Sequence, residues 1–485
     1  MKQLSGLDTV FLNLETHACP MHVGGLALLD VSTMPGGFTF QKVFEHVQER
    51  LHLLPPFRRR LVTTPLGLDQ PYWIEDPDFE LENHVRRRGL PGRGGHRELR
   101  DLVCDVMSVP LDRSRPLWEI YVIEGFKDGR VALITKIHHA CIDGVSGAEM
   151  MSVLLDLQAE RKEIPPPETP WQPDQEPSML KLSWMTTKKT LVRPQEGIRL
   201  IRESFPLVVT AGKALLEARR KAKAHARTVE DEGGQSKAAL GAPRTRFNTQ
   251  ITGRRSYAYG TLSLDDIKFV KNAFGCTVND VVLNISAEAL RRYLDDKGEL
   301  PEAPLYAGVP VSVRSEEQKG KGGNQVTMVR TNLHTEIADP VERLAAINQR
   351  MQQVKKSQQA VPANLLLDWV ALPAPALMAQ AARLYENFAI QDYYNPPFNV
   401  VISNVPGPQV NLYFAGAQVT ENHPVSIPYH GLAFNITVMS YRNQMDYGLT
   451  AHRDTLPDIG YFAELFEEAL EELKKRAKQQ LKKAS

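Results

Sequence analysis

The chain has 485 residues, of which 42% are hydrophobic and 24% are charged. These proportions are ordinary for a folded globular protein and exclude disordered, collagen-like and multi-span membrane proteins. The 58 Lys and Arg residues and 57 Asp and Glu residues leave a net charge of +1. No overall field therefore favours nucleic acid as a partner, and we expect any anionic ligand to be held by a local patch.

The cysteine count and the chain start predict a cytoplasmic protein. Four cysteines are too few and too widely spaced for a disulfide framework or a zinc knuckle, which indicates a reducing compartment. The first twenty residues carry Asp8 and Glu15 where a signal peptide needs an uninterrupted apolar core. The most apolar stretch, residues 361–380, is interrupted by Asp368 and three prolines, so we expect it to be buried or to line a cavity rather than to span a membrane.

A proline-rich segment divides the chain. Residues 165–177 contain six prolines in thirteen positions, which is typical of a stiff connector. A helix-compatible basic stretch and a polar, glycine-containing stretch follow it. We therefore expect an N-terminal lobe over residues 1–164, a connector over 165–249 and a C-terminal lobe over 250–485.

The first half contains a predicted hairpin followed by a helix. Residues 116–126 and 131–139 are rich in β-branched and aromatic side chains and flank the turn-prone segment Lys-Asp-Gly-Arg. Apolar residues at helical spacing predict a helix over 147–160. Two adjacent histidines, His138 and His139, stand where the second strand ends.

The second half of the chain contains both predicted strands and predicted helices. A Thr-x-x-Asp spacing from Thr277 to Asp280, just before an apolar run, predicts a helix N-cap. Basic residues late in the last segment match the dipole of an amphipathic helix. The expected elements are a strand at 257–262, a helix at 264–274 closed by Gly275, a helix at 278–294, a strand that runs into a Pro-Gly turn at 400–408, a hairpin at 434–452 and a C-terminal helix from 458. Interleaved strands and helices in two halves predict an α/β or α+β sandwich with two lobes.

The segment His138-His139-Ala140-Cys141-Ile142-Asp143-Gly144 carries the most chemistry. A neutral imidazole can take a hydroxyl proton near neutral pH, and general base catalysis of this kind contributes about 10²- to 10⁴-fold. Successive strand side chains face opposite ways, so only one of the two histidines can face a cleft easily. The other is expected to pack in the core. Gly144 would let a backbone amide approach a developing oxyanion.

Three other interpretations of this segment remain open. Adjacent histidines occur incidentally in many chains. A metal site could draw on His138, His139, Cys141 and Asp143, but neighbouring ligands diverge and no second cluster is evident. Residues 144–148 approach the serine nucleophile elbow, yet position 148 is Ala where that pattern has Gly.

The same segment resembles the HHxxxDG motif of CoA-dependent acyltransferases and peptide-synthetase condensation domains. Further segments narrow the resemblance, over almost the whole chain, to the bacterial wax ester synthase/diacylglycerol acyltransferase family. They are the opening residues 4–26, the segment RSRPLWEIYVIEG at 113–125, CTVNDVVL at 276–283, VPVSVR at 309–314, GNQV at 323–326 and SNVPGP at 403–408.

This resemblance implies a fold like chloramphenicol acetyltransferase, with two lobes around a tunnel that passes the histidines. His139 would be the general base that deprotonates a fatty alcohol or diacylglycerol, which then attacks acyl-CoA directly without an acyl-enzyme. No cofactor or metal is implied, since acyl-CoA is a co-substrate. The partners would be these substrates and the surface of a membrane or a lipid inclusion.

Several motif residues are expected to support the structure rather than to react. By analogy with related folds, Asp143 would pair with Arg314 and hold the loop in place, with His138 packed behind it. Asn279 and Asp280 are expected to cap a helix near the site. Trp118, the first apolar residue of its strand, is expected in the core.

Surface contacts are less sharply indicated by the sequence. Residues 211–227 carry six basic side chains and one glutamate, and the last twelve residues carry six basic side chains without an acid. Such stretches suit an anionic lipid surface but also an ordinary solvated helix face. The runs Arg58–Arg60 and Arg86–Arg88 could hold the phosphates of CoA or simply face solvent. Residues 365–379 could line the alcohol channel or belong to the core.

The leading hypothesis is an O-acyltransferase that makes wax esters, triacylglycerols or both. One alternative is a condensation-type acyltransferase that uses a carrier-protein thioester. Another is a non-catalytic protein that binds lipid or coats droplets, although such a coat has no use for a buried base.

Overall fold

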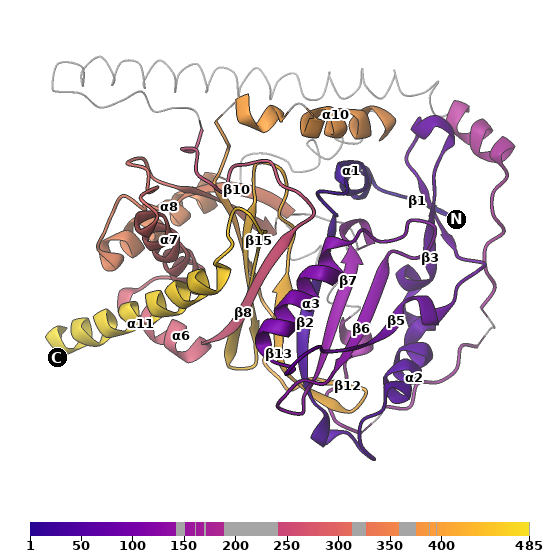
Figure 1. The fold of residues 1–485 in the computed structure, drawn as a ribbon, viewed down its shortest axis with the longest axis horizontal. Helices are drawn as coiled ribbons and strands as arrows, with labels where there is room; N and C mark the ends of the chain where they lie inside the picture. The colour runs from indigo at the N-terminus through magenta and orange to yellow at the C-terminus, as the bar shows by residue number, and fades with distance from the viewer. Residues whose placement is uncertain are drawn as a thin grey trace.

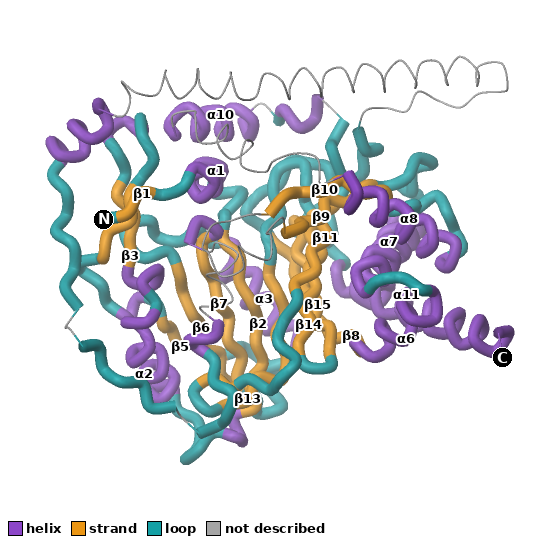
Figure 2. The backbone as a smooth tube through the Cα atoms, turned by 180° about the vertical axis from the view of Figure 1, so that it is seen from behind, coloured by secondary structure: helices purple, strands orange, loops and turns teal. Residues whose placement is uncertain are grey.

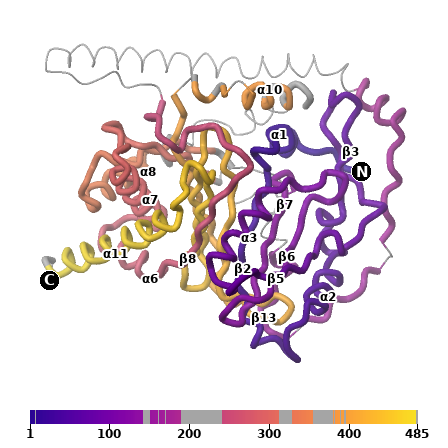
Figure 3. Tube along the Cα trace, in the orientation of Figure 1, coloured from indigo at the N-terminus to yellow at the C-terminus, as the bar shows by residue number. Residues whose placement is uncertain are grey.

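The computed structural model describes residues 1–141, 151–160, 162–168, 171–188, 241–312, 326–357, 375–387, 389–393 and 395–484. They form two lobes that lie side by side, each built on a six-stranded mixed sheet (Figure 1). The positions of both termini can be seen in Figure 3. The expected two-lobed α+β architecture is confirmed.

The sheet of the first lobe has the order β12-β13-β2-β7-β6-β5. Its strands are β2 (His22–Asp30), β5 (Val85–Gly89), β6 (Trp118–Glu124), β7 (Val131–His138), β12 (Tyr413–Phe414) and β13 (Ala417–Val425). β6 and β7 pair antiparallel, as the predicted hairpin requires, and β2 lies against the other edge of β7.

Each face of this sheet is covered by one helix. Side chains alternate along a strand, so Ile134 on β7 packs under α3 (His96–Ser108) while Leu133 packs under α2 (Phe40–Arg50). Leu99 and Val103 of α3 are completely buried. The two apolar layers hold β7 in place along its length and thereby fix where the strand ends.

The sheet of the second lobe has the order β10-β9-β11-β14-β15-β8. Its strands are β8 (Arg255–Ser263), β9 (Tyr306–Ser312), β10 (Val326–Asn332), β11 (Val400–Val405), β14 (Phe434–Tyr441) and β15 (Gln444–His452). β11 runs parallel to both of its neighbours, whereas β14, β15 and β8 are antiparallel in turn.

Four helices cover the outer side of this second sheet (Figure 1). They are α6 (Leu264–Phe274), α7 (Val278–Asp296), α8 (Pro340–Ser357) and α11 (Ile459–Ala484). α6 ends at Gly275 in the left-handed conformation (φ +65°), as the sequence predicted. Phe434 of β14 and Phe462 of α11 meet edge to face with ring centroids 4.9 Å apart, deep in the largest apolar cluster.

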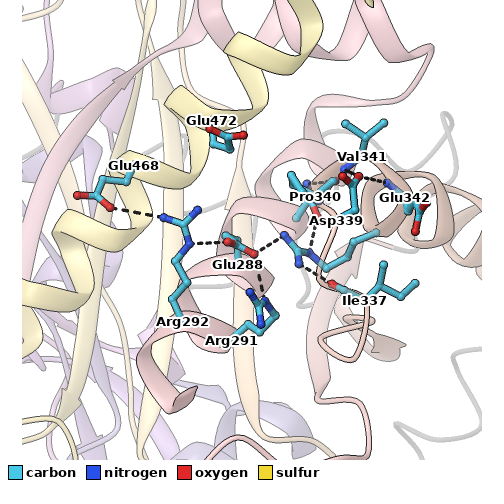
Figure 4. Close-up of polar contacts among 12 residues, drawn as sticks. Glu288, Arg291, Arg292, Ile337, Asp339, Pro340, Val341, Glu342, Glu468 and Glu472 are labelled. Carbon is cyan, nitrogen blue, oxygen red and sulfur yellow. Dashed lines mark hydrogen bonds and ion pairs between the residues drawn. The ribbon is translucent and has the colours of Figure 1, made fainter. Parts of the chain in front are cut away.

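A carboxylate between arginines links the helices of this layer (Figure 4). Glu288 of α7 contacts Arg291 and Arg292 of the same helix and Arg343 of α8, whose Nη2 lies 2.6 Å from Glu288 Oε2. Arg292 reaches on to Glu468 of α11 at 3.5 Å. Because the Arg343 side chain is completely buried, this contact is the electrostatic centre of the helical layer.

Two helices lie above the lobes in the view of Figure 1. α1 (Gly6–Leu14) and α10 (Pro375–Asn387) pack against each other, as the reverse view in Figure 2 also shows. A small sheet, β1-β4-β3, is formed by β1 (Lys2–Gln3), β3 (Arg59–Val62) and β4 (Tyr72–Glu75). Single 3₁₀ turns are η1 (Val31–Thr33), η2 (Leu51–Leu53), η3 (Pro55–Arg58), η4 (Pro65–Gly67), η5 (Leu81–Asn83), η6 (His139–Cys141) and η9 (Ile390–Tyr393).

The C-terminal half of the chain completes the first lobe. β13 pairs antiparallel with β2 over seven residues and also packs on β14 and β15 of the second lobe. Residues 250–485 therefore form more than the second lobe, because they also contribute β12 and β13 to the sheet of the first lobe. No local pattern in the sequence indicates this crossover, because it is a pairing between residues about 400 positions apart.

One predicted helix is partly wrong. Of the expected helix at 147–160, residues 151–154 are helical, but residues 155–160 are not. The main chain of Asp156 instead pairs with Tyr413, and its carboxylate binds the buried Arg50 at 2.9 Å. A buried charge pair with two bridge hydrogen bonds here outweighs a weak helical preference.

Candidate active site

The two histidines stand at the upper end of β7, where the sheet gives way to the 3₁₀ turn η6. The His138 amide donates to the Leu117 carbonyl at 3.0 Å, and the His139 amide donates to the Met21 carbonyl at 2.8 Å. Consecutive amides thus bind opposite neighbouring segments, as in a regular strand. The two rings are therefore directed into different surroundings.

His138 lies in the core with no exposed surface. Its Nδ1 accepts the Ala140 amide at 3.0 Å, so the neutral ring carries its proton on Nε2. Burial, followed by the nearby charge of Arg113, lowers the pKa of His138 well below its ordinary value. Its register partner on β2, His22, is also buried, donates Nε2–H to the Met107 carbonyl at 2.8 Å, and has its pKa lowered by burial to about 3. Both rings are therefore neutral structural groups.

A carboxylate from the end of α1 faces His138. Glu15 Oε1 lies 3.6 Å from His138 Nε2 and makes no hydrogen bond to any described residue, while Glu15 Oε2 accepts from Arg113 at 2.6 Å. Arg113 also donates to the Leu12 carbonyl at 2.6 Å. This Glu15–Arg113 pair fixes α1 above the histidines.

The His139 ring stacks on Phe11 of α1, with centroids 3.9 Å apart and planes 17° from parallel. It is partly exposed, unlike His138. Burial lowers its pKa from the ordinary 6.5, and an interaction with its own main-chain carbonyl opposes the shift. His139 Nδ1 is buried without a hydrogen-bond partner on another described residue. The ring is thus neutral at pH 7 and is held by one aromatic face.

An apolar cavity of about 310 Å³ lies where α1 and α10 meet the second lobe. Leu14 of α1, Met21, and Ala382 and Tyr385 of α10 line it, together with Tyr429 from the second lobe. Met21 is the residue whose carbonyl holds the His139 amide. The cavity and the histidine therefore share both α1 and the segment that leads from α1 into β2, and the cavity can accept a hydrocarbon chain.

Arginines of the two triple runs are mostly neutralised within the first lobe. Arg58 and Arg59 lie 3.6 and 3.0 Å from Glu75, and Arg60 lies 3.1 Å from Asp76. In the second run, Arg86 and Arg87 pair with Glu119 and Glu124, and Arg88 lies over the Tyr121 ring. These runs therefore form structural ion pairs rather than an open site for phosphate.

Asp280 caps α7 as the sequence predicted. The Thr277 hydroxyl accepts the Asp280 amide at 3.2 Å, and Asp280 Oδ2 accepts the Thr277 amide at 2.9 Å, which makes a capping box. Asn279 is partly exposed in the first turn of α7. Among described residues, neither Asn279 nor Asp280 forms a hydrogen bond to His138 or His139, and their support of the site stays a prediction.

Trp118 lies in the core, as expected. Its ring stacks between Phe57 and His84 with centroids 4.2 and 4.6 Å away, and its indole N–H donates to the Phe57 carbonyl at 2.8 Å.

Several predicted residues lie outside the described part of the chain. They are Asp143, Gly144 and Arg314, the basic stretch 211–227 and residues 365–374 of the possible channel segment. The suggested Asp143–Arg314 pair and the oxyanion amide therefore stay predictions. Within the described ranges, no group of three or more His, Cys, Asp or Glu side chains could hold a metal ion.

Sequence reasoning missed most of the cavity wall and the Glu15–Arg113 pair. Phe11 and Leu14 stand at i, i+3 on α1, a spacing that could have indicated one apolar helix face. No comparable signal marks Tyr429, because its position depends on how the second lobe folds back.

Comparison with known proteins agrees with this geometry. The model of the wax ester synthase/diacylglycerol acyltransferase catalytic domain matches residues 4–282, and the C-terminal domain of that family matches residues 322–474. A relative from Mycobacterium tuberculosis, named as a candidate diacylglycerol O-acyltransferase, is 37% identical over 474 residues, which cover 98% of this chain and 90% of the relative.

Solved structures give the same result. The wax ester synthase/diacylglycerol acyltransferase from Marinobacter aquaeolei is 33% identical, with a TM-score of 0.67 over 98% of this chain and 100% of that one. The first condensation domain of the calcium-dependent antibiotic synthetase, 13% identical with a TM-score of 0.55, covers 98% of this chain and 96% of its own and shares the fold. The chain therefore belongs to the wax ester synthase/diacylglycerol acyltransferase family, and it is an acyltransferase.

Proposed function

We propose that this protein transfers a long-chain fatty acyl group from acyl-CoA to the hydroxyl of a fatty alcohol, of diacylglycerol, or of both, with His139 as the general base. The observation that carries the proposal is a neutral, partly exposed imidazole at the end of β7, whose amide is held by Met21, a residue that lines an apolar cavity. Full-length similarity to diacylglycerol O-acyltransferases supports the choice of substrates.

In this mechanism His139 Nε2 accepts the hydroxyl proton while the alcohol oxygen attacks the thioester carbonyl. The tetrahedral intermediate collapses, the C–S bond breaks, and the CoA thiolate takes the proton from the imidazolium. An ester and free CoA leave, and His139 is neutral again. Stacking on Phe11 keeps the ring in one orientation through both proton transfers, which is where α1 contributes to the reaction.

The test is release of free thiol from palmitoyl-CoA with hexadecanol, diolein or no acceptor offered in parallel. We expect acceptor-dependent release, and a loss of about 100-fold or more in the His139→Ala variant, since general base catalysis is worth that much. His52→Ala, on a 3₁₀ turn of the same lobe, is the matched control. Undiminished turnover in His139→Ala would refute the base, and no release with either acceptor would refute the reaction.

We also infer peripheral contact with an anionic lipid surface. Lys475, Lys478 and Lys482 are exposed near the end of α11. On the helical residues 179–188, Leu180 and Trp184 are 84% and 72% exposed. The two groups lie at opposite ends of the molecule in Figure 1, so they form two separate candidate surfaces for a membrane or a lipid inclusion, one basic and one apolar. No described helix is both long and apolar enough to cross a bilayer.

Sedimentation with vesicles of phosphatidylglycerol tests this contact. Replacing Lys475, Lys478 and Lys482 together by Gln should weaken binding at low salt, and Trp184→Ser should weaken it at all salt concentrations. Binding that survives both changes would remove these surfaces from the proposal.

A further inference from the structure

A groove of about 770 Å³ lies next to the 17–22 segment, which also contributes Cys19 and Met21 to the apolar cavity. Five arginines line it. Arg97 and Arg100 come from α3, Arg254 and Arg255 from the start of β8, and Arg453 from the turn after β15. The groove thus lies where the first lobe meets the second, next to the side-by-side elements α3, β8 and α11 in Figure 1.

Most of these arginines have no carboxylate partner. Arg254 pairs with Asp454 at 3.0 Å, but no carboxylate in the described part of the chain lies within ion-pair distance of Arg97, Arg100, Arg255 or Arg453. This differs sharply from the paired arginines of the two triple runs. Asp101 and Asp105 also line the groove, so five guanidinium groups face two carboxylates and the lining is positive.

Arg255 forms the floor of the groove. The residue is only 6% exposed. Its guanidinium donates to the carbonyls of Thr252 and Ala18, the latter at 2.6 Å. A buried guanidinium held only by neutral carbonyls retains its full charge, because arginine does not lose its proton in proteins. This fixed charge is costly to bury without an anion, which points to an anionic ligand.

The first turn of α11 adds a second favourable element. Ile459 and Gly460 line the groove at the start of this 26-residue helix, and the carboxylate of the preceding Asp458 is bound by Tyr293 and Lys297. Helix N-termini favour phosphate through their amides and dipole. Arginine is the side chain best suited to phosphate because its planar group donates two parallel hydrogen bonds.

We propose that this arginine groove binds the phosphate groups of the CoA donor. The inference rests on the proposed function, since CoA is the phosphate-bearing substrate of that reaction. The floor residue Arg255 holds Ala18, three residues before the Met21 carbonyl that binds the His139 amide. Phosphates in the groove and a hydrocarbon chain in the cavity would then flank one short segment of chain, with the histidine beside it.

Titration calorimetry with CoA tests the groove without any turnover. Arg100→Gln and Arg453→Gln should each weaken CoA binding about tenfold, as expected for a charge-assisted phosphate contact, and the double variant more. Arg453→Lys should recover part of the affinity. Arg350→Gln, an exposed arginine on α8, is the matched control and should bind CoA like the parent protein. Unchanged affinity in the double variant overturns the proposal.

Two further arms identify the source of the phosphate. Inorganic phosphate should compete with CoA in the parent protein and lose that effect in the double variant; phosphate that binds without displacing CoA overturns the assignment. If the double variant keeps its CoA affinity but no longer binds phosphatidylglycerol vesicles, the groove binds a lipid headgroup and the assignment to CoA is wrong.

Turnover separates this inference from the reaction itself. The ratio of kcat/KM for palmitoyl-CoA to that for palmitoyl-N-acetylcysteamine, a thioester without phosphates, should fall about 100-fold in the double variant. Ester formation with an unchanged ratio refutes the groove alone. If the parent protein forms no ester but the double variant still loses CoA affinity as expected, the reaction is refuted and the assignment of the groove to CoA stands.

Discussion

At the scale of single residues, the site depends on histidines that stay neutral. His139 has a lowered pKa because it is buried against Phe11, so its lone pair is available at pH 7 and is lost only on acidification below the ordinary 6.5. We predict that kcat/KM falls on the acid side with an apparent pKa below 6.5 and is flat from there to pH 8. Steady-state rates across pH 5 to 8 measure this, and an acid limb centred above 7 would contradict a buried base.

The buried histidines also make stability depend on pH. The folded-state pKa values of His22 and His138 are depressed, so the unfolded chain binds more protons below pH 6.5 and folding free energy is lost as the pH falls. Each such group costs about 1.4 kcal/mol per pH unit well below 6.5. Urea unfolding at several pH values measures how steeply the free energy of unfolding changes with pH. This dependence should be weaker for His138→Asn than for the parent protein, whereas His17→Asn, a change at an exposed histidine, should leave it unchanged. Equal slopes in all three would mean that His138 is not buried in a neutral form.

Sequence reasoning located the reactive pair but not its surroundings. His138 and His139 stand in one motif at a strand end, and alternation along β7 accounts for one ring in the core and one stacked on Phe11 of α1. The arginine groove was missed because its members come from positions 97 to 453 and meet only in the fold. The conspicuous triple-Arg runs, in contrast, lie opposite acidic residues of adjacent strands.

At the scale of elements, the helical layer of the second lobe depends on Glu288. Burial raises the pKa of this carboxyl, but Arg343 and then Arg292 outweigh burial, and the net shift is downward. Glu288→Gln leaves the completely buried Arg343 without its anion, so we predict a loss of about 3–5 kcal/mol in the free energy of unfolding. Chemical denaturation at pH 7 measures it.

Glu468→Gln is the matched control for that change. Glu468 touches the same cluster through Arg292 at 3.5 Å but is 65% exposed, so its removal should cost less than about 1 kcal/mol (Figure 4). Because the folded-state pKa of Glu288 is lowered, the difference between the two variants should be present above pH 5 and shrink as the pH falls through that pKa. Equal losses in both variants would show that the cluster has no buried centre.

Elements with strong local signals were predicted well. α6 has the predicted bounds because Ser263 caps its start and Gly275 ends it, and the hairpin β6–β7 follows from alternation around a turn. Residues 155–160 were predicted wrongly because a distant partner, Arg50, binds Asp156 and holds the chain out of a helix. The local spacing of apolar residues carries no information about a contact between positions as far apart as 50 and 156.

At the scale of the whole molecule, β13 joins the lobes. The Asn422 amide donates to Asp446 of β15 at 2.7 Å, and Tyr257 of β8 donates its hydroxyl to the Pro424 carbonyl at 3.1 Å. Arg130, from the β6–β7 turn, binds Glu421 on the same strand at 2.6 Å. One strand thus contacts both sheets, and we expect the described lobes to unfold in a single transition.

Gly448 makes this junction possible. A β-carbon at position 448 would stand 1.7 Å from the Pro424 carbonyl oxygen, so β15 can approach β13 only with glycine there. The clash is with backbone, which cannot rotate away. We therefore predict that Gly448→Ala costs more than about 3 kcal/mol and weakens both lobes together, since overpacking alone costs up to that amount. Differential scanning calorimetry, read with near-UV circular dichroism, measures the loss.

Gly89→Ala separates this steric effect from the general effect of adding a methyl group to a strand. A β-carbon on Gly89, at the end of β5, would meet nothing within 4 Å, so that variant should unfold within a few degrees of the parent protein. A lowered transition for Gly448→Ala that stays single indicates that the junction couples the lobes. Two separate transitions would mean that each lobe holds its own core, in which case the active site between them would open before either lobe unfolds.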